Sequence, residues 1–219
     1  MFLTVFLLAC SQNNPVGTQM VNDTIKPEEN NISQEAELEG LYGDRHLINC
    51  SDNEQIALTG DFKKLDSLYK NLLPNAYSGQ TIYVKLKGLF TSEGKSKELL
   101  VKEVLQAEQK NDKNTCIPYD YWCRGSEPFW MVQISAKENL IDFFDPMSSE
   151  YYHFSFSKPE NRQATTIYTA EDKTANNKIR ISITKEECSD GMSERKYQYK
   201  AEVVLNGITY NGCAIGIKD

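Results

Sequence analysis

The sequence of 219 residues lacks most features of nucleic-acid-binding and membrane-spanning proteins. It has 24 Lys and Arg against 31 Asp and Glu, a net charge of -7, and no basic stripe. Nucleic-acid partners are therefore disfavoured, because phosphates are neutralised by clustered Lys and Arg. The apolar run at residues 2–8 is far shorter than the roughly 20 residues that a membrane-spanning helix needs, so it does not predict one.

Signals for catalysis and metal binding are also scarce. The chain has only two histidines, His46 and His153, and neither has a second ligand at a recognised spacing. No nucleophile elbow or oxyanion-hole element is present. We therefore expect no catalytic residue, no metal site and no cofactor. Two alternatives stay open: a copper site built from distant Met, His and Cys residues, and a nucleophilic Cys123 activated by Arg124 or paired with His153.

The N-terminus indicates where the protein resides. Residues 7–10 read Leu-Leu-Ala-Cys at the end of an apolar run, which is typical of a bacterial lipobox. We expect residues 1–10 to be a lipoprotein signal segment, with Cys10 lipidated and the membrane bound through that anchor. Ser11 is not the Asp that retains lipoproteins in the inner membrane of enteric bacteria. The predicted location is the outer membrane, facing the periplasm.

Next, residues 11–37 are rich in Asn, Gln, Glu, Thr and Pro and predict a disordered tether. Residues 38–116 follow another pattern. Short strands are expected at 41–49 and 55–58, a helix capped by Asp61 at 61–73, and further strands at 81–90 and 99–105. Four strands around one helix predict a small OB-like barrel, which the polar run 106–115 separates from the rest.

Residues 117–219 show no helical periodicity. Asn206-Gly207 is a strong type I′ hairpin signal between two apolar runs. Together with other short alternating segments this predicts a second small antiparallel β-barrel or sandwich, so the fold class is mainly β. The expected strands are 129–135, 140–144, 151–156, 166–169, 178–184, 197–205 and 208–210.

Two segments of this second half form recognisable motifs, Gly-Ser-Glu-Pro-Phe-Trp at 125–130 and Cys-Ser-Asp-Gly-Met-Ser at 188–193, the latter leading to Gly212-Cys213. In these motifs the chain resembles a family of uncharacterised bacterial envelope lipoproteins. The resemblance covers residues 117–217.

Residues 40–116 carry a second set of short motifs: Gly40-Leu41-Tyr42, Asn49-Cys50, Gly60-Asp61 with Leu65 and Tyr69, and Leu86-Lys87-Gly88. In these motifs the segment resembles the C-terminal OB domain of NlpE-type lipoproteins. NlpE-type proteins also carry a C-x-x-C pair, linked to copper homeostasis and envelope stress signalling, and this sequence has none. What the resemblance implies is therefore the scaffold and the location.

Six cysteines beside an export signal predict an oxidising compartment and structural disulfides. Cys188 and Cys213 both lie in the terminal motif and are expected to pair. The NlpE resemblance suggests that Cys50 pairs with Cys116, which leaves Cys123 as a free thiol. The rival pairing of Cys116 with Cys123 frees Cys50 instead.

Six residues are candidates for a binding rim, because they are polar or aromatic and lie in or near the motifs. A purely structural interpretation is open for the motifs, with Pro128 fixing the entry to a strand and Gly191 supplying a turn. The candidates are Tyr121, Trp122, Glu127, Trp130, Asp190 and Ser193.

The function predicted from these observations is a non-enzymatic, lipid-anchored accessory or stress-related binding module. Its expected partner is another envelope protein or a small ligand. The alternatives are a periplasmic inhibitor of a hydrolase such as lysozyme and a copper-handling lipoprotein.

Overall fold

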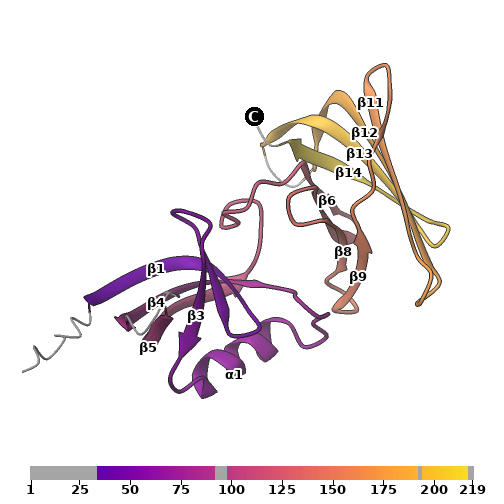
Figure 1. Cartoon of the computed structure of the whole chain (residues 1–219). Coiled ribbons are helices and arrows are strands. Elements are labelled where there is room, and N and C mark those ends of the chain that lie inside the picture. The colour runs from indigo at the N-terminus through magenta and orange to yellow at the C-terminus, as the bar shows by residue number, and fades with distance from the viewer. Residues whose placement is uncertain (1–33, 92–97, 192–193, 217–219) are drawn as a thin grey trace, which may run out of the picture. The chain divides into compact units, whose positions relative to one another are not determined.

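The computed structural model describes residues 34–91, 98–191 and 194–216 (Figure 1). The chain is mainly β, as predicted, with a five-stranded barrel followed by a nine-stranded sheet. Cys10 and Ser193 lie outside the described residues, as does the segment predicted to be a tether up to residue 33. The described part holds no helix of the length and apolarity that crossing a bilayer requires.

The first unit is a closed barrel with the strand order β1-β2-β3-β5-β4. Neighbouring strands are antiparallel except β3 and β5, which pair in parallel and close the barrel. This topology with one helix between β3 and β4 confirms the predicted OB-like fold. Its elements are β1 (Gln34–Gly43), β2 (His46–Asn49), β3 (Gln55–Thr59), α1 (Lys63–Leu72), β4 (Ile82–Thr91) and β5 (Glu98–Gln109).

The first strand differs from the prediction at both ends. Asp44 and Arg45 have φ of 48° and 61°, so the chain reverses there and the expected strand 41–49 is a hairpin of β1 and β2. β1 also begins at Gln34, inside the segment expected to be tether. Two ion pairs to β4, Glu35 with Lys87 at 3.1 Å and Glu39 with Lys85 at 2.7 Å, accompany the pairing of this polar stretch.

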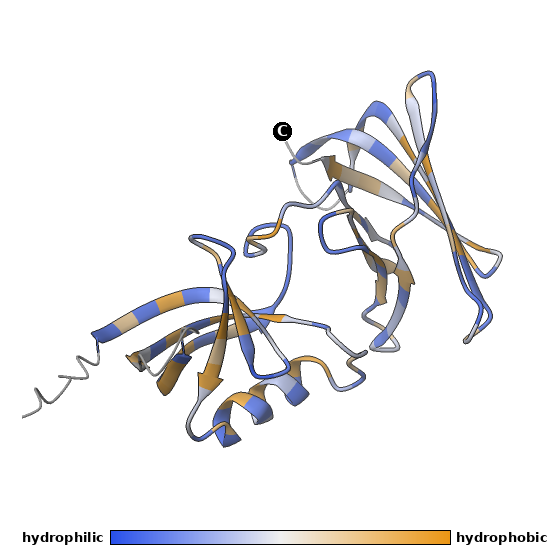
Figure 2. Cartoon of the chain, viewed as in Figure 1, coloured by the Kyte–Doolittle hydropathy of each residue, from blue (hydrophilic) through white to orange (hydrophobic). Residues whose placement is uncertain are grey.

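Helix α1 begins two residues later than predicted, and the Oδ1 of Asp61 accepts a 3.0 Å hydrogen bond from the backbone N–H of Lys63. Leu65 is buried in the barrel core, and Phe62 and Tyr69 pack against the same core. Figure 2 shows hydrophobic and hydrophilic residues alternating along β1, as expected for a strand whose side chains point in turn toward the barrel core and toward solvent.

The second unit is one antiparallel sheet in the order β10-β11-β12-β13-β14-β6-β7-β8-β9. It curls into a half-barrel in which β9 lies against β11, so the expected barrel or sandwich is a single curled sheet. Its strands are β6 (Tyr121–Ser126), β7 (Phe129–Ser135), β8 (Leu140–Asp145), β9 (Glu150–Ser155), β10 (Glu160–Arg162), β11 (Thr165–Asp172), β12 (Asn177–Ser189), β13 (Lys196–Leu205) and β14 (Ile208–Gly216).

The inner face of the curled sheet encloses an apolar core. Trp130, Phe143 and Phe154 are the largest fully buried side chains there. Two strands, β6 and β10, were missed by the sequence analysis, and β5 extends to Gln109 into the run that was expected to separate the units.

The loop that follows α1 and the segment that follows β5 both contact the curled sheet. Tyr77 donates a hydrogen bond to Asp142, and Lys110 forms a 2.7 Å ion pair with Glu138. The Lys110 and Glu138 side chains are only 10% and 11% exposed. These contacts join the barrel to the sheet through buried charged and polar groups.

Candidate functional site

The two recognised motifs meet at the hairpin of β6 and β7. Its register places Gly125 opposite Trp130 and Ser126 opposite Phe129, with Glu127-Pro128 as the turn. Phe129 points outward and is 50% exposed, whereas Trp130 is 1% exposed. The hairpin therefore presents one aromatic ring to solvent and buries the other.

Trp130 packs against one glycine of each motif, Gly125 and Gly212. A Cβ atom at Gly125 would overlap the indole Nε1, and one at Gly212 would overlap the backbone carbonyl of Arg124 and lie 2.8 Å from Cζ2 of the indole ring. The ring therefore lies across both glycines, one on β6 and one on β14, which are neighbouring strands. Only glycine leaves the backbone open enough for the ring at these positions.

The second motif is held beside the first by a disulfide and by hydrogen bonds. Cys188 is bonded to Cys213, as expected, which fixes the end of β12 near β14. The hydroxyl of Ser126 donates to the backbone carbonyl of Asp190 at 2.8 Å. Tyr197 donates to the Asp190 carboxylate at 2.9 Å. Segments about 60 residues apart in sequence thus form one surface.

Between them lies a groove of two adjoining hollows, which share Arg124, Gly125, Ser126 and Asp190 as walls. The apolar hollow, of about 470 Å³, is lined further by Phe129, Trp130, Met131 and Pro146. The polar hollow, of about 440 Å³, is lined further by Glu127, Cys188, Ser189, Gly191, Lys200, Asn211 and Gly212. We call this surface the motif groove. Hollows of this size suit a small ligand or a short peptide.

The charges of the motif groove fall into two kinds. The Arg124 guanidinium pairs with Asp112, whose side chain is 8% exposed, and Arg195 lies 3.9 Å from the same carboxylate. Glu127 and Lys200, by contrast, are exposed and make no hydrogen bond or ion pair with any residue that the structure describes. One acid and one base are therefore open to a ligand.

The structure places the predicted rim residues in three different settings. Glu127 and Asp190 line the motif groove, and Trp130 is buried beneath it. The expectation for Tyr121 and Trp122 is corrected. Tyr121 packs against the core of the curled sheet, and Trp122 is 4% exposed and borders a separate cavity of about 40 Å³ near Tyr77.

Phe129 is the groove residue that sequence reasoning missed as a candidate. The signal was available, since adjacent residues of a strand face opposite sides and Trp130 was the better candidate for burial. Lys200 carried no signal, because one lysine in an alternating strand resembles any other exposed lysine. Its place at the groove depends on the pairing of β14 with β6, two strands that lie far apart in the sequence.

Among the cysteines that the structure describes, Cys123 is the one outside a disulfide, and it is fully buried in the core of the curled sheet. Burial raises the pKa of its thiol well above the usual range, and the charge of Arg124 offsets this only in part. His153 is engaged elsewhere: its Nδ1 lies 2.6 Å from the Asp142 carboxylate, and its ring stacks on Tyr77. Neither the access nor the thiolate that a nucleophilic cysteine needs is present at Cys123.

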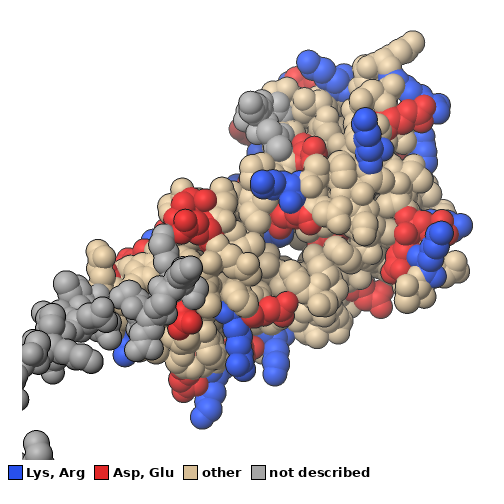
Figure 3. Space-filling model, viewed as in Figure 1, with Lys and Arg blue, Asp and Glu red and all other residues tan. Residues whose placement is uncertain are grey.

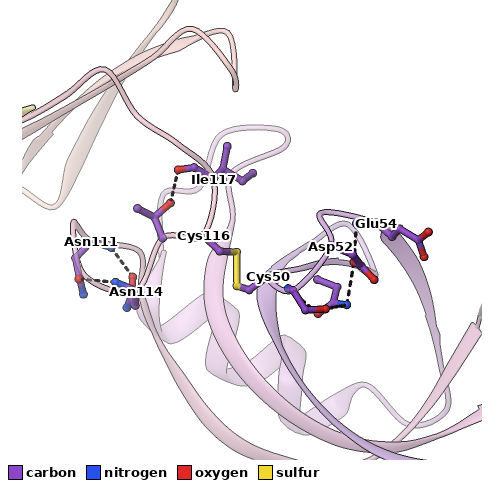
Figure 4. The surroundings of a disulfide bond; sticks show 10 residues. Cys50, Asp52, Glu54, Asn111, Asn114, Cys116 and Ile117 are labelled. Atoms are coloured by element: carbon purple, nitrogen blue, oxygen red, sulfur yellow. Dashed lines mark hydrogen bonds between the residues drawn. A yellow bond between two sulfur atoms is a disulfide. The ribbon is translucent and has the colours of Figure 1, made fainter. Parts of the chain in front are cut away.

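The other disulfide joins Cys50 to Cys116, the pairing suggested by the resemblance (Figure 4). It connects the turn after β2 with the segment that follows β5. Side-chain hydrogen bonds order both partners: Asp52 accepts from the backbone N–H of Glu54 at 2.9 Å, and Asn114 accepts from that of Asn111 at 2.7 Å. The bridge therefore anchors the segment that carries Asp112 toward Arg124.

Within the described residues, no group of three or more His, Cys, Asp and Glu side chains is arranged to hold a metal ion. The face seen in Figure 3 carries basic and acidic side chains in small intermixed groups. The motif groove itself has one apolar half and one charged half.

Comparisons with protein-family models, with curated proteins and with solved structures found no match to this chain.

Proposed function

We propose that this chain is a lipid-anchored protein of the bacterial envelope that acts by binding, with the motif groove as its binding surface. The observation that carries the proposal is the convergence of the two motifs on one groove, with Phe129, Glu127 and Lys200 exposed at it. Motifs that served only to bury Trp130 would not need an exposed aromatic ring at Phe129 or a carboxylate at Glu127 that pairs with no described residue.

The N-terminal sequence and the disulfides support the location. The lipobox ending at Cys10 predicts export and lipidation, and two disulfides suit an oxidising compartment. The resemblance to envelope lipoproteins agrees with an outer-membrane protein that faces the periplasm. A Cys10→Ser variant should lose incorporation of labelled fatty acid and move from the membrane fraction to the soluble fraction. Unchanged labelling would exclude Cys10 as the anchor.

A non-enzymatic role is supported by the setting of the free thiol. Cys123 is buried, and its raised pKa keeps it protonated at neutral pH. No His lines the hollows around Glu127 and Lys200, and the one Cys among their lining residues, Cys188, is bonded to Cys213. Binding needs only the groups seen at the groove, whereas catalysis would need further groups that the described lining residues do not supply.

Photo-cross-linking in cells tests the role of the motif groove. A benzophenone amino acid placed at Phe129 should form a specific adduct with an envelope component on irradiation. Leu105 on β5 is a suitable control, because it is also apolar and is 41% exposed, but it lies in the barrel. Equal adducts at both positions, or none at Phe129, would argue against the groove as a binding surface.

A further inference from the structure

We propose that the motif groove binds a short zwitterionic peptide whose apolar side chain fills the apolar hollow while its carboxylate meets Lys200 and its ammonium meets Glu127. The inference rests on the proposed function and names the ligand class for the same groove. Free dipeptides with large apolar side chains are the simplest members of this class.

The charged side chains that line the groove favour a ligand with two opposite charges. Arg124 is neutralised by Asp112, and the Asp190 carboxylate accepts a hydrogen bond from Tyr197. Among the charged side chains that line the two hollows, only Glu127 and Lys200 lack a partner within the described residues. A ligand of a single charge would satisfy one of them and repel the other. A ligand with one charge of each sign satisfies both.

The apolar hollow favours a ligand that carries an apolar side chain. Phe129, Met131 and Pro146 form its walls, and Trp130 lies beneath it. An exposed phenylalanine at the edge of a hollow contributes contact area with little loss of rotamer freedom. An apolar side chain of the ligand would cover this ring, which gives the ligand an amphipathic character as well as two charges.

The apolar and polar hollows adjoin each other, which allows one ligand to fill both. The apolar and polar hollows share the walls Arg124, Gly125, Ser126 and Asp190, so one ligand can occupy both at once. The bond between Ser126 and Asp190 fixes one side of the groove against the other. A groove that is already ordered loses little entropy on binding, which favours small ligands.

Calorimetric titration of the detergent-solubilised full-length protein with leucyl-phenylalanine tests the proposal. We expect a dissociation constant of about 1 mM or below. N-acetylation of the dipeptide removes its ammonium, and amidation removes its carboxylate. Each change should weaken binding by about threefold to fivefold, as expected for an ion pair at a partly exposed site.

Matching variants assign each charge to its partner. Lys200→Gln should weaken binding of the free dipeptide but leave binding of the amidated form unchanged, since that contact is already missing. Glu127→Gln should behave in the same way toward the acetylated form. Lys173→Gln and Glu103→Gln, at exposed positions outside the groove, serve as controls and should bind like the unchanged protein.

Three results would overturn the proposal: no binding up to about 10 mM dipeptide, equal binding of the free and capped forms, or additive effects of the variants and the caps. If the dipeptide fails while the adduct at Phe129 forms, the ligand class is wrong and the groove keeps its binding role. If both fail, the proposed function fails as well.

Discussion

Trp130 and the glycines around it give the motif of residues 125–130 a physical meaning. The indole ring occupies the space that a side chain at position 125 would fill and, together with the backbone carbonyl of Arg124, the space at position 212, so both motifs pack against one buried ring. The same hairpin then turns Phe129 outward, because adjacent strand residues alternate between faces. One buried and one exposed aromatic ring follow from the same local sequence.

Replacing Gly125 by Ala should therefore lower the free energy of unfolding by about 2 kcal/mol or more, because a Cβ atom would overlap the Trp130 indole. Urea denaturation measures the change. Gly216→Ala is the matched control in the same sheet, since a Cβ there would meet Tyr199 at an ordinary 3.4 Å. If both substitutions cost the same, the interpretation of the motif glycine is wrong.

His153 should make stability depend on pH. Its hydrogen bond to Asp142 raises the pKa of the imidazole in the folded protein. The resulting stabilisation is fully present below the unfolded-state pKa of about 6.5 and is lost as the pH rises through the higher folded-state pKa. The difference in unfolding free energy between the unchanged protein and His153→Gln should thus shrink as the pH rises from about 5 to 9. A difference that is constant with pH would contradict this assignment.

Sequence reasoning located the motif residues but did not settle their burial. Glu127 and Asp190 could be placed at the groove because turn residues are usually accessible. Tyr121 and Trp122 could not be placed, because they lie on β6, where Gly125 and Cys123 interrupt any clear alternation. The position of Lys200 at the groove depends on the pairing of β14 with β6, which are far apart in the sequence, so local sequence does not encode it.

Among the elements, the strands with strong signals were predicted well. The hairpin at Asn206 and Gly207, with φ of 50° and 86°, joins β13 and β14 as expected. β10 is a three-residue polar edge strand and left no apolar pattern to detect. The predicted second barrel or sandwich is a curled sheet whose strands β9 and β11 meet, and this contact between strands is not visible in the pattern of any one strand.

Each disulfide should stabilise the element that it closes. Chain-entropy estimates for loops of 25 and 66 residues give about 3 to 4 kcal/mol. Removing Cys188 and Cys213 together, as Cys188→Ala with Cys213→Ala, should increase hydrogen exchange at residues 186–191 while α1 stays protected. Hydrogen exchange followed by mass spectrometry measures both regions. Loss of protection in α1 to the same extent would show that the bridge does not act locally.

For the molecule as a whole, the contacts between barrel and sheet rely on buried polar groups. Lys110→Met would leave Glu138 buried without its cation, which should lower the unfolding free energy by about 3 kcal/mol. Adding Glu138→Leu should recover part of the loss, since the uncompensated charge is then gone. Denaturation of the single and double variants measures this. A double variant with a lower unfolding free energy than Lys110→Met alone would contradict the explanation.

A competition experiment decides whether the motif groove binds a zwitterionic peptide. The yield of the adduct at Phe129 is measured on irradiation with and without an excess of leucyl-phenylalanine. We expect the free dipeptide to suppress the adduct, and a form capped at both ends to leave it unchanged. If the free dipeptide has no effect on the adduct, or if both forms suppress it equally, the groove does not bind this class of ligand.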